Sequence, residues 1–204
     1  MKKSYLSVFF YFIVCYAFAQ QMQIDSLQKK LNTYKKEDTT KIELLIALGN
    51  AYLSSKPDTT ILLCEQAYQL SSTLKYEQGK AWALHRIGNA NWIKGNFPIA
   101  IEHAFTSLRL FEKIKNKTGI ANCYNLIANT YSMEKNYSKA MEYYGKSISI
   151  FEQVGDRFSI GRAYSNIGRT YYMQDKQELA LENVEKALLI LESLIVFFLL
   201  LLLN

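Results

Sequence analysis

The sequence predicts an all-α protein built from stacked helix-turn-helix units, and three observations lead to this fold class. One 40-residue unit recurs without gaps, so that Gly88, Ala128 and Gly168 occupy the same position in three successive copies. Each copy carries two apolar stripes with helical spacing, and a short polar segment separates them. Self-similarity at this period is typical of repeat arrays, in which each unit buries its apolar face only against its neighbours.

Residues 1–19 have the pattern of a secretory signal peptide. Two lysines precede an uncharged apolar run, and Ala17 and Ala19 supply the small residues that a signal peptidase requires. The alternatives are an uncleaved membrane anchor, for which the run is short, and a lipoprotein attached through Cys15. The pattern predicts an exported protein that is periplasmic, or associated with the inner membrane and facing the periplasm.

The mature chain begins with an amphipathic helix over residues 20–38, which we expect to cap the first repeat. Four repeats follow, at residues 39–78, 79–118, 119–158 and 159–193. In the third repeat the first stripe runs from Ile120 to Tyr131, and the second runs from Tyr137 to Phe151. Gly155 then suits a left-handed helix C-cap. The first repeat is one residue short in its turn.

Small residues recur where the two helices of a unit must touch. Gly88 and Gly168 lie inside predicted helices, where glycine costs about 1 kcal/mol relative to alanine, and a close partner helix explains this recurring cost. The fourth repeat combines Tyr164, Ile167, Gly168 and Tyr171 on its first helix with Ala180 and Ala187 on its second.

In these residues the chain resembles the tetratricopeptide repeat (TPR) family, in a 40-residue variety of its usual 34-residue unit. The pattern is weaker at Asn91, where the family has tyrosine, and at Thr60 and Cys64 in the first repeat. The resemblance implies a right-handed superhelical solenoid of helix-turn-helix repeats. It also implies binding of a protein or an extended peptide rather than catalysis.

Residues 194–204 form an apolar tail. Ten helical residues span about 15 Å, which is half of the roughly 30 Å hydrocarbon core of a bilayer. The pattern predicts a truncated or frame-shifted transmembrane segment that contacts the membrane; the alternative is a tail that buries itself on the fourth repeat. Signal peptide, repeat array and membrane span together resemble the exported sensor region of bacterial membrane-bound kinases and transcription regulators. No kinase or DNA-binding part can be matched in this sequence, so no catalysis is carried over.

Composition and motifs argue against several classes of function. The formal net charge is +6, and it falls to +4 when the two N-terminal lysines leave with the signal peptide. Lysines alternate with glutamates rather than cluster, so no nucleic-acid partner is expected. His85 and His103 lie on different predicted helices without a metal-binding spacing, and no nucleophile motif or phosphate loop is present. We therefore expect no enzyme, with no catalytic residue, no metal ligand and no cofactor. Cys64 and Cys123 are expected as buried free thiols, with a disulfide as the alternative that export would permit.

The first helix of each repeat carries the candidate binding surface, because in the TPR family that face lines the concave groove. Asn50, Asn89 and Asn129 occupy one repeat position, although asparagine is a poor residue inside a helix. An amide can donate to and accept from the backbone of an extended peptide. The predicted groove residues are Asn50, Trp82, His85, Asn89, Trp92, Asn125, Asn129 and Arg169.

Two alternatives remain open for this surface and for the protein. The asparagines could instead hydrogen-bond neighbouring helices, and the tryptophans could pack against the adjacent repeat rather than anchor a partner. For the whole chain, the sequence favours a peptide-binding module of the cell envelope, taken as a truncated sensor ectodomain. The alternative is a structural scaffold that uses its outer faces and its apolar tail to assemble an envelope complex.

Overall fold

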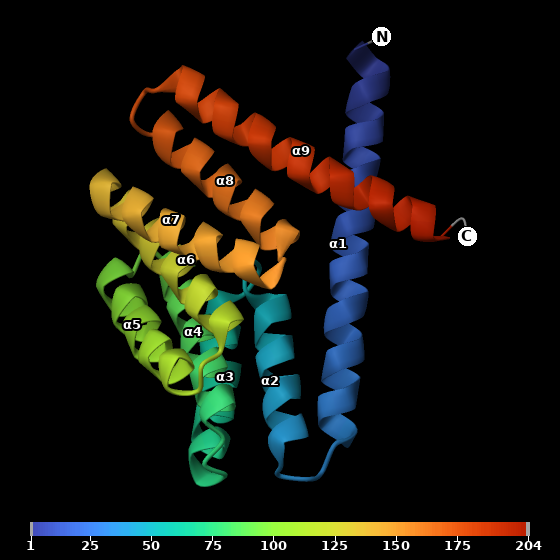
Figure 1. Cartoon of the computed structure of the whole chain (residues 1–204). Coiled ribbons are helices and arrows are strands. Elements are labelled where there is room, and N and C mark those ends of the chain that lie inside the picture. The colour runs from blue at the N-terminus through green and yellow to red at the C-terminus, as the bar shows by residue number, and fades with distance from the viewer. Residues whose placement is uncertain (1, 203–204) are drawn as a thin grey trace. The chain divides into compact units, whose positions relative to one another are not determined.

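The computed structural model describes the backbone of residues 2–202 and the side chains of residues 18–194. All secondary structure in this described part is helical, which confirms the all-α fold class. The chain divides into two compact units, residues 1–94 and 95–204. The first unit contains α1 (Lys2–Thr33), α2 (Thr39–Tyr52), α3 (Pro57–Thr73) and α4 (Glu77–Ile93) (Figure 1). The second contains α5 (Phe97–Lys113), α6 (Lys117–Met133), α7 (Tyr137–Val154), α8 (Arg157–Tyr172) and α9 (Gln177–Leu202).

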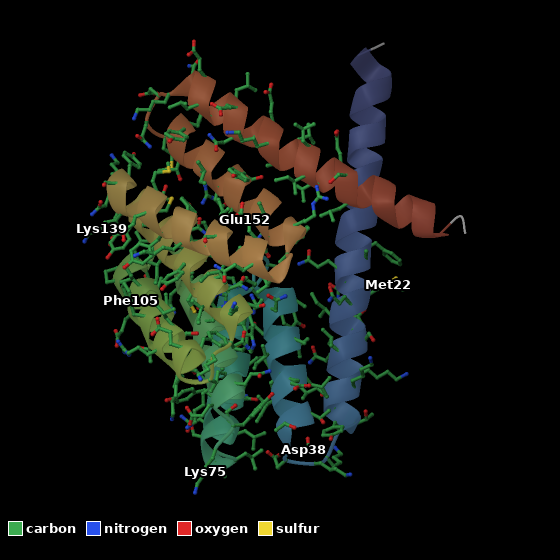
Figure 2. The ribbon with its side chains drawn as sticks, viewed as in Figure 1. Met22, Asp38, Lys75, Phe105, Lys139 and Glu152 are labelled. Atoms are coloured by element: carbon green, nitrogen blue, oxygen red, sulfur yellow. The ribbon has the colours of Figure 1, made fainter. Side chains whose placement is uncertain are left out.

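In the first unit, α1 lies beside α2 and covers its apolar face. Ile24 of α1 is buried against Leu48 and Ala51 of α2. Met22 lies on the side of α1 that faces away from α2 (Figure 2) and is 59% exposed. The helix ends at Thr33, five residues before the end that the sequence predicted.

Asp38 explains this earlier end, because it caps the next helix instead of continuing the first. Its carboxylate accepts hydrogen bonds from the backbone amides of Thr40 and Lys41, at 3.0 and 3.2 Å. Side-chain acceptors at this position satisfy amides that have no partner inside the helix. The hydroxyl of Tyr34 donates to the same carboxyl group at 2.7 Å. These hydrogen bonds lower the pKa of Asp38, the bond from Tyr34 having the largest effect.

Close contacts between paired helices explain the small residues inside them. A Cβ atom built on Gly49 of α2 would lie 2.9 Å from Sγ of Cys64 on α3. In the second unit, a Cβ on Gly168 of α8 would lie 2.8 Å from Cγ2 of Val184 and 3.0 Å from the carbonyl oxygen of Ala180, both on α9. A Cβ atom does not fit at these distances unless its neighbours move, so the sequence interpretation of Gly168 agrees with the structure, and Gly49 follows the same rule.

The core of the second unit joins α6, α7 and α8. Ala128, Ala140, Tyr144 and Ile167 form one buried cluster, in which the first three are fully buried. Partly buried side chains from the same helices surround it: Tyr131, Met141, Tyr143, Ile148, Tyr164 and Tyr171. Aromatic rings therefore fill the space that the small residues leave open.

The turns share one backbone geometry. A residue with positive φ follows each helix from α3 to α8, and these residues are evenly spaced along the chain, half a repeat apart: Lys75, Gly95, Lys115, Lys135, Gly155 and Asp175. A left-handed residue just past a helix lets the last carbonyls find partners and reverses the chain. The turn between α2 and α3, all of whose residues the structure describes, has no such residue, and it is the turn that the sequence predicts to be one residue short.

Both cysteines in the described side chains are free and buried, as the sequence predicted. Burial raises the pKa of Cys64 and of Cys123 to about 12. In the part of the chain that the structure describes, no helix is both long enough and apolar enough to cross a bilayer. The side chains of 1–17 and of 195–204 lie outside the described residues, and most of the predicted signal peptide and apolar tail falls there.

Candidate peptide-binding surface

A pocket of about 330 Å³ lies between α2 and α4 in the first unit. Helix α2 contributes Glu43, Ile46 and Asn50, which are spaced along one face. Helix α4 contributes Trp82 and Arg86, four residues apart, and Tyr76 precedes this helix. The pocket therefore brings together two predicted groove residues, Asn50 and Trp82, from the first helices of neighbouring repeats.

The walls of this pocket combine an aromatic surface with charged and polar groups. The guanidinium of Arg86 lies 5.6 Å from the ring centroid of Trp82, which is cation–π geometry. The hydroxyl of Tyr76 donates to the Glu43 carboxylate over 3.4 Å. Burial, together with the negative charge of Glu43, raises the pKa of Tyr76. Asn50 is exposed at the pocket. Such a surface can hold an apolar side chain while an amide contacts the ligand main chain.

The other predicted groove residues of α4 are buried or partly buried. His85 is 3% exposed and makes an edge contact with Trp82, the ring centroids being 5.6 Å apart. The Asn89 side-chain amide donates to the carbonyl of His85 at 2.9 Å, within the same helix. Trp92 is partly buried. The side-chain nitrogen of Asn89 thus already has an intrahelical contact, which a ligand would have to share.

In the second unit, the predicted groove asparagines bond to neighbouring helices. Asn129 is 9% exposed, and its amide oxygen accepts a hydrogen bond of 2.6 Å from the hydroxyl of Tyr144 on α7. Asn125 accepts from the side-chain amide of Asn166 on α8 at 3.4 Å. These contacts agree with the alternative interpretation, in which the asparagines hydrogen-bond neighbouring helices rather than a ligand.

Tyr144 also links Asn129 to a further predicted groove residue. Burial raises the pKa of Tyr144, and interactions of its hydroxyl with Thr170 and Arg169 of α8 oppose that rise. The structure thus gathers Asn129 and Arg169 around one buried hydroxyl. Arg169 itself is exposed on α8. Their role in ligand binding stays a prediction.

Sequence reasoning missed part of the first-unit pocket. Arg86 lies four residues after Trp82, and this helical spacing alone places both side chains on one face. Tyr76 comes from the segment before α4, where helical periodicity gives no guidance. A second hollow of about 650 Å³, lined by residues such as Lys41, Glu65 and Gln69, contains none of the predicted groove residues. Among the described side chains, no group of three or more histidine, cysteine, aspartate or glutamate residues could hold a metal ion.

Comparison with known proteins identifies the repeats. Residues 79–153 match the family model described as tetratricopeptide repeat. These residues are TPR repeats, as their sequence pattern predicted. Among curated proteins, no sequence matches this chain significantly.

Solved structures with similar folds are helical-repeat proteins. A Rap protein complexed with competence and sporulation factor is 18% identical, with a TM-score of 0.73 over 89% of this chain and 52% of that chain. BtubC (BKLC) from P. vanneervenii is 15% identical, with a TM-score of 0.64 over 86% of this chain and 74% of that chain. MamA is 26% identical, with a TM-score of 0.52 over 83% of this chain and 87% of that chain. The chain thus spans about half the length of the Rap protein and most of the other two.

Fold and repeats together define a TPR-type protein-interaction module. Folds of this kind generally serve as non-catalytic scaffolds that bind proteins, because their stacked helices present long continuous surfaces. The particular partner is not defined by the fold.

Proposed function

We propose that this chain is a non-catalytic TPR module of the bacterial cell envelope that binds an extended peptide or protein segment. Its binding surface is the one carried by the first helices of the repeats, with the pocket between α2 and α4 as the principal anchor. Its setting is the exported sensor region of a membrane-bound kinase or regulator, so that ligand binding would be the input signal. The signal-peptide pattern of residues 1–19 supports this location.

The pocket between α2 and α4 is the observation that carries the proposal. It combines the aromatic surface of Trp82, the aliphatic side chain of Ile46 and the exposed amide of Asn50. Peptide-binding sites commonly join an apolar anchor point with polar groups that fix the main chain. The Rap protein, which has a similar fold, was solved with a competence and sporulation factor bound, and it shows that such a fold can hold a partner.

Selection of peptides on the full-length protein tests the proposal. A random-peptide phage library is panned on the immobilised protein, and enriched peptides are synthesised and measured by fluorescence polarisation. We expect enrichment of peptides with an aromatic or aliphatic anchor residue. Trp82→Ala should weaken their binding at least tenfold, which corresponds to about 1.4 kcal/mol. Asn50→Ala should weaken it severalfold, by the loss of one hydrogen-bonding group.

Matched variants separate the pocket from general surface effects. Asn32→Ala removes an exposed asparagine of α1, and Ile99→Ala removes an apolar side chain of α5, the second helix of its repeat, that is 45% exposed. Both should leave peptide affinity unchanged. If no peptide is enriched, or if the enriched peptides bind the Trp82→Ala protein as well as the wild type, the pocket is not the binding site.

The proposed location has its own test. The protein is expressed with a C-terminal tag in a Gram-negative host, the cell fractions are separated, and the N-terminus is sequenced. Export predicts a periplasmic or membrane-associated product that begins at Gln20. A product that retains Met1 in the cytoplasmic fraction would contradict both export and the sensor setting, while the peptide-binding proposal would stand.

A further inference from the structure

Helix α9 exposes a row of apolar side chains. The residues at the same repeat positions on α7 are buried or partly buried. Leu181, Val184 and Leu188 are 60%, 47% and 54% exposed. They follow one another at i, i+3 and i+7, so they lie on one face of the helix. We call these three residues the α9 stripe. In Figure 1, α8 and α9 run side by side, and the α8 side of α9 is buried through Ala180 and Ala187.

The residues 40 positions earlier in the chain lie on α7 and show how the same apolar stripe packs there. The counterparts of the α9 stripe are Met141, Tyr144 and Ile148 of α7. Tyr144 is fully buried in the cluster that α7 forms with α6 and α8, and Met141 and Ile148 are partly buried side chains that pack against this cluster. From α8, Ile167 belongs to the cluster and Tyr164 and Tyr171 pack against it, the three being spaced at i, i+3 and i+7. At these positions, the second helix of one repeat packs against the first helix of the next repeat.

Charge defines the helix that the α9 stripe would accept. Glu178, Glu185 and Glu192 are exposed and share the face of Leu181 and Leu188, at helical spacing. Glu182 pairs with Lys186 within α9, at 2.5 Å. The stripe is therefore bordered by carboxylates, and a partner helix with basic residues beside its apolar side chains would be complementary.

Helix α8 of this chain is basic, and Arg157 shares the face of Tyr164 and Tyr171 because the three follow one another at seven-residue spacing. It carries Arg157, Arg162 and Arg169 and no acidic residue. Its aromatic and aliphatic side chains fill the α7 surface that is equivalent to the α9 stripe.

We propose that the α9 stripe is a docking site for a basic amphipathic helix of a partner protein, with bulky apolar side chains at i, i+3 and i+7. Binding would repeat the interface that α8 makes with α7, so it continues an interface that the unit already contains. This site is distinct from the pocket between α2 and α4 and does not depend on peptide binding there. Helix-in-groove recognition of this kind uses a few apolar anchors on one helix face.

A peptide with the sequence of α8, residues 157–172, is the probe for this proposal. The peptide is labelled with a fluorophore and titrated with the full-length protein, and binding is followed by fluorescence polarisation. We expect saturable binding that weakens at least tenfold with Leu188→Glu, because the substitution places a charge where an apolar side chain should be buried. Glu185→Lys should also weaken binding, and added salt should reduce the affinity of the wild type.

Leu189→Glu is the matched control for Leu188→Glu. Leu189 is 67% exposed, and its counterpart on α7 is Ser149, which is exposed rather than packed against α8. This substitution should leave peptide affinity unchanged. Because Leu188 and Leu189 are both exposed, neither variant should unfold the protein, and circular dichroism checks that both keep the wild-type helix content.

A second peptide tests the contribution of charge. Helix α6, residues 117–133, carries Tyr124, Ile127 and Tyr131 at the positions of Tyr164, Ile167 and Tyr171, but it has a single basic residue. It should bind more weakly than the α8 peptide. The proposal is overturned if Leu188→Glu leaves binding of the α8 peptide unchanged or if Leu189→Glu weakens it equally. It is also overturned if sedimentation shows a dimer that Leu188→Glu dissociates and that the peptide does not disrupt, because the occupant is then a second copy of this chain.

Discussion

Replacing Gly168 and Gly145 by alanine, one at a time, tests the close packing between α8 and α9. Alanine is favoured over glycine inside a helix by about 1 kcal/mol, and this gain should apply at both positions. Around Gly145 of α7, a Cβ would meet no atom within 4 Å. At Gly168 it would lie 2.8 Å from Cγ2 of Val184 and 3.0 Å from the carbonyl oxygen of Ala180. The side chain of Val184 can move, but the carbonyl belongs to the helix backbone.

The expected changes in the free energy of unfolding have opposite signs. Gly145→Ala should stabilise the protein by about 0.5–1 kcal/mol. Gly168→Ala gains the same helix preference but adds an overpacking cost of about 1–3 kcal/mol, so it should be destabilising by about 1 kcal/mol. The two variants should therefore differ by about 2 kcal/mol. For a chain of this size, that difference corresponds to roughly 4–8 °C in Tm.

Thermal and urea unfolding, followed by circular dichroism at 222 nm, measures this difference. Repeat arrays need not unfold in a single step, so the two variants are compared under identical conditions rather than through absolute stabilities. If Gly168→Ala raises the Tm as much as Gly145→Ala, then the contact between α8 and α9 is looser than the structure shows. The explanation given for glycine inside these helices would then be wrong.

Three further predictions concern hydrogen bonds, a helix cap and the cysteines. Tyr144→Phe removes the donor to the nearly buried amide oxygen of Asn129, and it should lower the free energy of unfolding by about 1–3 kcal/mol in urea titrations; an unchanged midpoint would argue against this bond. The folded-state pKa of Asp38 lies below its ordinary value of 3.8, so its stabilising effect is present above that pH and is lost as the pH falls through the folded-state pKa. Asp38→Ala should thus melt below the wild type at pH 7, the gap should close in acid, and a gap that is independent of pH would refute the assignment. With Cys15→Ser to remove the remaining thiol, neither buried cysteine, each with a pKa of about 12, should react with Ellman's reagent at pH 8 until denaturant is added, and rapid labelling of the native protein would show that a thiol is accessible.

Helical periodicity could predict the repeats because it depends on residues that are close in sequence. Tyr164, Ile167 and Tyr171 define a helix face by spacing alone, and the polar segments that follow each stripe coincide with the observed turns. The end of α1 was predicted five residues too late. Charged residues near a helix end fit either a solvent-exposed turn of helix or a cap, and only the contacts of Asp38 decide between them.

The candidate site was harder to predict, because its contacts join residues from different helices. Asn129 fits a groove position by periodicity, but its partner Tyr144 comes from the next helix, and its hydroxyl lies 2.6 Å away. Rotation of a helix by a few tens of degrees decides whether a polar side chain faces solvent or a neighbour, and a stripe pattern does not fix the rotation that closely. Asn50 and Trp82 line one pocket, because both belong to first helices of adjacent repeats, and their role in binding stays a prediction.

The evenly spaced left-handed turns have a consequence for how the length of such a chain can change. From Lys75 to Asp175, the same backbone geometry returns after every half repeat, whether the position holds glycine, lysine or aspartate. A segment one whole repeat long, cut between two of these positions, begins and ends in the same local conformation. Gain or loss of such a segment by recombination would leave every remaining helix with its register and its turn intact.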